Sequence, residues 1–157
     1  WHQRLMLPAL AALMAAVLLT SSAHAIGLGA RAGMSLEPDQ FVLGGQAMIG
    51  QVFPMIELAP GLDLGFGNDV STTVVNVDFR FNLPSLPKVS PNIYVGAGPA
   101  YVSAEPDGGK RDGEIAASIF AGMRIPFSPV SSYNLEARFG LGDYPDMKFL
   151  FGVLFGL

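Results

Sequence analysis

Apolar and polar side chains alternate strictly along Val70–Asn82. Successive side chains of a β-strand point to opposite faces, so this alternation predicts a strand. The strand is longer than the ~5–6 residues of a mean globular strand and reaches the ~9–11 residues needed to cross a bilayer at a tilt. One face carries Val75, Val77, Phe79 and Phe81, and the other carries Val74, Asn76, Asp78, Arg80 and Asn82. A soluble sheet would bury the first face, whereas a membrane barrel would turn it to lipid and the charges to its lumen.

The rest of the chain beyond residue 25 repeats this pattern in segments of similar length, separated by turn-forming residues. An even number of such segments, each connected to the next, is typical of an up-and-down barrel. We therefore predict an all-β fold, an eight-stranded antiparallel up-and-down transmembrane β-barrel preceded by a helical signal peptide. The expected strands are Ile26–Met34, Gln40–Val52, Met55–Phe66, Val70–Asn82, Asn92–Ser103, Glu114–Ile125, Ser132–Leu141 and Met147–Leu157.

The connections predict two chemically different ends. If Ile26 starts on the periplasmic side, the outer loops contain most of the charges outside the strands, and the inner turns contain six prolines and one charge, Lys88. The outer loops are expected at Ser35–Asp39, Gly67–Asp69, Ala104–Gly113 and Gly142–Asp146, and the inner turns at Phe53–Pro54, Leu83–Pro91 and Pro126–Ser131.

Charged residues within the strands share a face with glycines, which would leave room for long side chains inside a narrow barrel. An isolated buried ion costs several kcal/mol, so these charges are expected to pair. Counting back equally from the loop Gly67–Asp69 places Glu57 opposite Arg80, and we predict that they pair. A structural plug is the favoured interpretation of this lumenal charge network, and a gate or ligand site is the alternative. The network comprises Arg31, Glu57, Asp63, Asp78, Arg80, Arg124, Glu136, Arg138 and Lys148.

Aromatic residues lie towards the strand ends, which is typical of the interfacial girdles of membrane barrels. They are Phe41, Phe53, Phe66, Phe81, Tyr94, Tyr101 and Tyr133. Composition agrees with a β-barrel: 50% of residues are hydrophobic and 14% charged, yet beyond residue 25 no apolar run reaches the ~18 residues of a membrane helix.

Residues 1–25 have the features of a signal peptide. A short start containing Arg4 precedes the apolar run Leu5–Leu19, and Ala23-His24-Ala25 fits the A-x-A cleavage pattern. An uncleaved anchor is the alternative, but the run is short and contains Pro8. We expect residues 1–25 to be removed and residues 26–157 to form the barrel domain.

The last strand, from Lys148, resembles the C-terminal assembly signal of outer-membrane barrels, a G-x-x-aromatic-x-aromatic pattern. Gly152 and Phe155 match it, and Leu157 replaces the usual terminal Phe. With the strand rhythm of residues 26–157, the chain resembles the small OmpA/OmpX-like outer-membrane β-barrel family. The resemblance implies a bacterial outer membrane, contact with its lipid and lipopolysaccharide, the barrel assembly machinery as a partner, and roles in adhesion, membrane integrity or stress response.

Several kinds of chemistry are excluded or disfavoured. There is no Cys, and both histidines, His2 and His24, precede residue 26, so an activated nucleophile would have no His base. We expect no enzyme activity, no cofactor and no metal site, although acidic residues around the loop at 104–113 could collect a divalent cation. A net charge of −4 without a basic cluster argues against nucleic acid.

The sequence thus predicts a structural or surface-interaction role in membrane integrity or adhesion, with no surface partner identified. The alternatives are a narrow channel or small-solute binder, a lipid-A-modifying enzyme, and a soluble exported lipocalin-like barrel.

Overall fold

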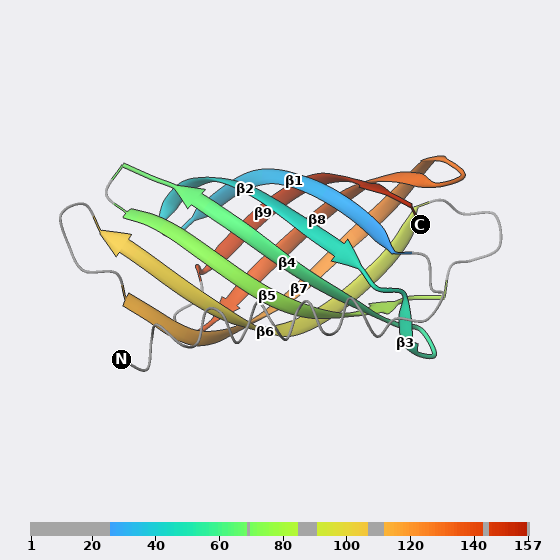
Figure 1. Cartoon of the computed structure of the whole chain (residues 1–157), viewed down its shortest axis with the longest axis horizontal. Helices are drawn as coiled ribbons and strands as arrows, with labels where there is room; N and C mark the ends of the chain where they lie inside the picture. Colours follow the sequence, from blue (N-terminus) through green and yellow to red (C-terminus); the bar gives the residue numbers. More distant parts are fainter. Residues whose placement is uncertain (1–25, 69, 85–90, 107–111, 143–144, 157) are drawn as a thin grey trace.

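A computed structural model describes residues 26–68, 70–84, 91–106, 112–142 and 145–156. Within these ranges nine antiparallel strands form one sheet in the order β2-β1-β9-β8-β7-β6-β5-β4-β3, and a further pairing of β2 with β4 closes the sheet into a barrel (Figure 1). The strands are β1 (Gly27–Leu36), β2 (Asp39–Met48), β3 (Gln51–Phe53), β4 (Ile56–Phe66), β5 (Val70–Asn82), β6 (Asn92–Pro106), β7 (Asp112–Ser128), β8 (Ser131–Leu141) and β9 (Met147–Phe155).

The barrel closes through continuous ladders. The first and last strands, β1 and β9, pair from Leu28 opposite Phe155 to Ser35 opposite Lys148. A closed sheet satisfies the backbone groups of its long strands by inter-strand pairing, which a strand crossing hydrocarbon requires. The eight long strands follow the chain in next-neighbour order, so the predicted eight-stranded up-and-down barrel is confirmed.

One expected strand, Gln40–Val52, is broken in two, which corrects the sequence interpretation. Gln46 lies opposite Gly61, whereas Gln51 lies opposite Glu57, so the chain gains one residue relative to β4 between these pairs. Gly50 stands in this interval with φ = 83°, a left-handed conformation that favours glycine. The bulge separates the short β3 from β2.

Several loops are shorter than predicted because the ladders extend further. The outer loop expected at Ser35–Asp39 is reduced to a turn at Glu37-Pro38, and β6 and β7 extend into the loop expected at Ala104–Gly113. At the opposite end of the barrel, Ser128 pairs with Ser131, which shortens the expected turn Pro126–Ser131. We call the two ends the loop end, at residues 37–38, and the terminus end, where β1 begins and β9 ends; in Figure 1 the C-terminus marks the latter.

The barrel places apolar side chains outside and charges inside. Phe41, Leu62 and Phe149 are 51%, 43% and 47% exposed on the outer face, while Arg80 and Arg138 are 0% exposed in the lumen. This is the reverse of a soluble barrel, so the lipocalin-like alternative is wrong. A membrane barrel requires this arrangement because lipid contacts its outer face.

Most of the aromatic residues expected in a girdle are exposed near strand ends, including Phe53 and Phe66. Tyr94 is the exception, and its assignment to the girdle is wrong. It lies on the inward face of β6 and is fully buried, with its hydroxyl group among lumenal polar groups.

The predicted signal peptide at residues 1–25 and the terminal Leu157 lie outside the described residues. No helix in the described part of the chain is long and apolar enough to cross a membrane.

Leu62→Arg tests the outer face. Leu62 faces outward near the middle of β4. An arginine there should lower the free energy of unfolding, measured for the barrel in lipid vesicles, by about 2–4 kcal/mol, because that is the cost of this charge at a bilayer midplane. Ser71→Arg is the control, because Ser71 is exposed near the loop end of β5, where the cost should be about 0–1 kcal/mol. Equal costs at the two positions would contradict the depth that we assign to the outer face.

Candidate functional site

The barrel brings all nine residues of the predicted lumenal charge network to its interior. Eight are buried, and the ninth, Glu57, has a side chain that is 15% exposed. They form three ion-paired groups: Arg138 and Arg80 with Asp78 and Glu136; Arg31 and Lys148 with Asp63; and Arg124 with Glu57.

Arg138 on β8 is the centre of the largest group. Its guanidinium donates from Nη1 and Nη2 to the two carboxylate oxygens of Asp78 on β5, at 3.0 and 2.6 Å. It also donates to Glu136 Oε1, at 2.7 Å from Nη2, and to Ser118. The guanidinium carbon lies 4.4 Å from the ring centre of Phe120, within range of a cation–π interaction. A bidentate pair of this kind fixes orientation as well as charge.

Arg80 on β5 extends this group towards β2. Its Nη2 donates to Glu136 Oε2 at 3.2 Å and to Gln46 Oε1 at 2.6 Å, and Nη1 lies 3.2 Å from the sulfur of Met48. The guanidinium carbon is 5.0 Å from the ring centre of Tyr94. The positive charge of Arg80 is thus compensated by one carboxylate that it shares with Arg138, by two neutral acceptors and by the face of an aromatic ring.

The second group joins β1, β4 and β9. Arg31 Nε donates to Asp63 Oδ1 at 2.7 Å, and Lys148 Nζ lies 3.6 Å from Asp63 Oδ2. Arg31 also donates to Gln46 Oε1 and Asn76 Oδ1, at 3.3 and 3.1 Å. Because Gln46 Oε1 accepts from both Arg31 and Arg80, this carbonyl links the two groups.

The predicted register between Glu57 and Arg80 is confirmed, but their predicted ion pair is wrong. The two residues are direct partners in the β4–β5 ladder. Arg124 on β7 instead donates to Glu57 Oε2 at 3.1 Å, while Arg80 reaches Glu136. The reason is the narrow lumen, in which a long arginine side chain can reach a carboxylate on a non-neighbouring strand.

Sequence reasoning missed the neutral members of the network. The Tyr94 hydroxyl lies 2.7 Å from Asn134 Oδ1 and 2.9 Å from Glu136 Oε2, and Gln46 and Phe120 contact the arginines as described above. The available signal was the alternation, because each of these residues shares a face with a lumenal charge on its strand or on the adjacent one. Their partners depend on distances across the lumen, which alternation does not give.

Inward glycines leave the volume that the long side chains occupy. A Cβ at Gly61 would lie 2.8 Å from Arg31 Nη2 and 3.0 Å from Asn76 Oδ1, and one at Gly122 would collide with the ring of Tyr94. A Cβ at either position would therefore force a neighbouring group to move. The predicted role of lumenal glycines in making room for long side chains agrees with these contacts.

Some buried donors lack a hydrogen-bond partner within the described residues. They are Gln46 Nε2, Asn76 Nδ2, Arg80 Nε, Arg124 Nε and the hydroxyl groups of Ser35 and Ser132. Polar lumenal space with such donors is suited to bound water. In the described ranges, no group of three or more His, Cys, Asp or Glu side chains is arranged to hold a metal ion.

The described residues of the expected assembly signal lie in β9. Gly152 is buried beside β1, where a Cβ would come within 2.8 Å of the Ala30 carbonyl oxygen, and Phe155 ends the strand with its side chain exposed. Their recognition by an assembly machinery stays a prediction.

No protein-family model matches the chain, and no curated protein matches its sequence. Solved structures do match its fold. The N-terminal β-barrel domain of Pseudomonas aeruginosa OprF aligns with a TM-score of 0.70 and 18% identity, over 83% of this chain and 96% of that one. Neisserial surface protein A aligns with a TM-score of 0.64 and 13% identity, over 84% and 94% of the two chains. A de novo designed transmembrane β-barrel aligns with a TM-score of 0.61 and 16% identity, over 87% and 98%.

These likenesses define the class of the molecule as a β-barrel with the fold of membrane-spanning barrels. Within that class, the chain has the fold of the small OmpA-like barrels, as the barrels of OprF and Neisserial surface protein A do. The resemblance drawn from strand rhythm and the last strand is thereby confirmed at the level of the fold.

A double-mutant cycle can separate the observed ion pair from the one predicted by register. We expect Glu57→Gln and Arg124→Met to be coupled by about 0.5–3 kcal/mol in the free energy of unfolding, because the two residues are in contact. Partial exposure of Glu57 should bring the value towards the lower end. The control cycle, Glu57→Gln with Arg80→Met, should show weaker coupling, because these ladder partners form no ion pair with each other. Coupling in the control cycle and none in the first would mean that the pairing described here is wrong.

Alanine in place of glycine should have opposite effects on the two faces. Gly61→Ala crowds Arg31 and Asn76, so it should lower the free energy of unfolding by about 1–3 kcal/mol, as overpacking does. Gly45 lies on the outer face, and the nearest atom would be 3.6 Å from a Cβ added there. Gly45→Ala should therefore leave the free energy of unfolding unchanged or raise it by about 0.5–1 kcal/mol. Urea titration of both variants in the same lipid provides the comparison. A tolerated Gly61→Ala would show that the lumen is looser than these distances indicate.

Proposed function

We propose that the protein is a bacterial outer-membrane β-barrel whose lumen is a closed structural plug, and that it acts in membrane integrity or in surface contact through its loop end. The observation that carries this proposal is the ion pairing of all nine lumenal charges with one another. A transport path would need mobile side chains or open space, whereas these side chains hold one another across the barrel.

Barrel size supports the same conclusion. Eight strands enclose an interior just wide enough for side chains to fill, and here Arg80, Arg138 and Tyr94 are fully buried within it. The apolar outer face suits contact with outer-membrane lipid and lipopolysaccharide. Export through a cleaved signal peptide and insertion by the barrel assembly machinery, through Gly152, Phe155 and Leu157, belong to this proposal.

A narrow channel or small-solute binder is the second candidate. The observation in its favour is the set of buried donors without a partner, including Gln46 Nε2 and Asn76 Nδ2, because bound water or a small polar solute could satisfy them. A lipid-modifying activity has less support, since His2 and His24 both precede the barrel and no His remains to activate a nucleophile.

Expression in a Gram-negative host and planar-bilayer recording test the proposal together. The protein should remain in outer-membrane fractions after urea extraction and show heat-modifiable mobility on gels. Once purified and folded, it should give no stable, large single-channel steps, because the ion-paired side chains block the lumen. Large steps would favour the channel, and release by urea would contradict the location in the membrane.

A further inference from the structure

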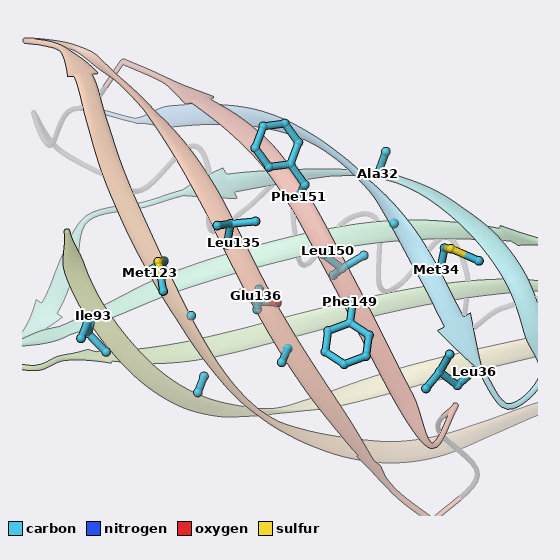
Figure 2. A pocket seen from close by; sticks show the side chains of 14 residues that line it. Ala32, Met34, Leu36, Ile93, Met123, Leu135, Glu136, Phe149, Leu150 and Phe151 are labelled. Carbon is cyan, nitrogen blue, oxygen red and sulfur yellow. The ribbon is translucent and has the colours of Figure 1, made fainter.

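An apolar groove of about 600 Å³ runs along the outer face of the barrel. Figure 2 shows its side chains spread across neighbouring strands, from Ile93 on β6 at one side to Met34 and Leu36 on β1 at the other. The lining residues include Ala32, Met123, Leu135, Ala137, Phe149 and Phe151. No feature of the lumenal network accounts for this groove, because its side walls consist of outward-facing residues.

Strand register explains the direction of the groove. One wall is a row of ladder partners nearer the terminus end, formed by Ile93, Met123, Leu135, Phe151 and Ala32. The other wall is the parallel row nearer the loop end, formed by Ala121, Ala137, Phe149 and Met34. The row between them supplies the floor with Gly122, Glu136, Leu150 and Gly33. The groove therefore crosses the strands from β6 to β1.

Small residues flank the groove, and its exposed lining is apolar. Ala121 and Ala137 are adjacent in the wall nearer the loop end, across the groove from Met123 and Leu135 in the other wall. Glu136 is the one ionisable residue of the lining, but its carboxylate binds Arg80 and Arg138 inside the lumen. The open side of the groove thus offers no polar side chain to water or to a polar ligand.

The dimensions of the groove fit a hydrocarbon chain within one leaflet. Four inter-strand spacings of ~4.8 Å separate β6 from β1, which gives a length of ~19 Å. With strands tilted by ~35–45°, a groove across them is oblique and rises ~12 Å along the membrane normal. One leaflet contributes ~15 Å of the ~30 Å hydrocarbon core. The upper end reaches Leu36, next to the exposed turn at Glu37, where a lipid headgroup could remain in the polar layer.

We propose that this groove binds one acyl chain of a bilayer lipid whose headgroup lies at the loop end. The inference rests on the proposed location of the barrel in a membrane. A flexible chain can follow an oblique channel between two rows of side chains, whereas a second rigid barrel would need a matching ridge along its wall. The occupant is therefore a lipid that the barrel retains more strongly than the lipids around the rest of its surface.

The test uses the folded wild-type protein and three variants. Each is inserted into vesicles of palmitoyl-oleoyl phosphatidylethanolamine and phosphatidylglycerol, transferred to a mild detergent, and analysed by native mass spectrometry for retained lipid. Ala137→Phe and, independently, Ala121→Leu fill the groove with apolar groups that remain compatible with lipid contact. Ala97→Phe is the matched control, because Ala97 is exposed on the outer face of β6 but does not line the groove.

We expect one retained lipid on the wild type and on A97F, and at least a tenfold loss of that species for A137F and A121L. Heat-modifiable gel mobility confirms folding of each variant, and A121L decides the result if A137F does not fold. Absence of a retained lipid on the wild type, or equal retention by a folded groove variant, would overturn the inference. Loss of a protein dimer in place of a lipid would assign the groove to a second copy of the chain. Failure of the wild type to insert into vesicles would instead contradict the proposed function.

Discussion

Charge balance inside the lumen is the constraint on which the rest of the structure depends. An uncompensated ion in a low-dielectric interior costs several kcal/mol, so each arginine must reach a carboxylate. The pairs Arg138–Asp78, Arg124–Glu57 and Arg31–Asp63 each join strands that are not neighbours in the sheet. These contacts add links across the lumen to the hydrogen-bonded ladders of the wall. A one-residue slip of a strand that carries one of these charges would turn the charge towards the outer face, so the network also specifies the register of those strands.

The two faces of each strand therefore meet different packing requirements. Inside, long polar side chains alternate with glycines, as where Gly61 lies beneath the Arg31 guanidinium and the Asn76 amide. Outside, large apolar side chains cover much of the wall, with small residues at positions such as Gly45, Ala97 and the adjacent pair Ala121 and Ala137. The same period of two produces both faces. On the inner face, small residues leave space for the long side chains that fill the lumen. On the outer face, small residues beside large ones leave a groove.

Alternation allowed most of the fold to be predicted, because a period of two identifies the strand and its two faces together. The register that places Glu57 opposite Arg80 could also be predicted, since a short loop fixes the register of the hairpin. The break at Gly50 was not, because a single glycine in a strand can be either an ordinary inward residue or a bulge. Tyr94 was wrongly assigned to the girdle for a similar reason. Its position near a strand end suggested an interfacial aromatic residue, but its side chain lies on the inward face of β6 and therefore enters the lumen. The partners of Glu57 and Arg80 depend on reach across the lumen, and no sequence pattern states that distance.

The composition of the lumen explains how it holds more cations than carboxylates. Two carboxylates are shared, Asp63 between Arg31 and Lys148, and Glu136 between Arg80 and Arg138. Neutral groups supply further negative potential: the Gln46 carbonyl accepts from two guanidinium groups, and the faces of Tyr94 and Phe120 lie beside Arg80 and Arg138. Aromatic rings also fill volume, so a single side chain contributes both charge compensation and closure of the lumen. Each lumenal cation therefore has a carboxylate partner, and this compensation supports the proposed plug over a selectivity filter, which would present uncompensated charge to a permeating ion.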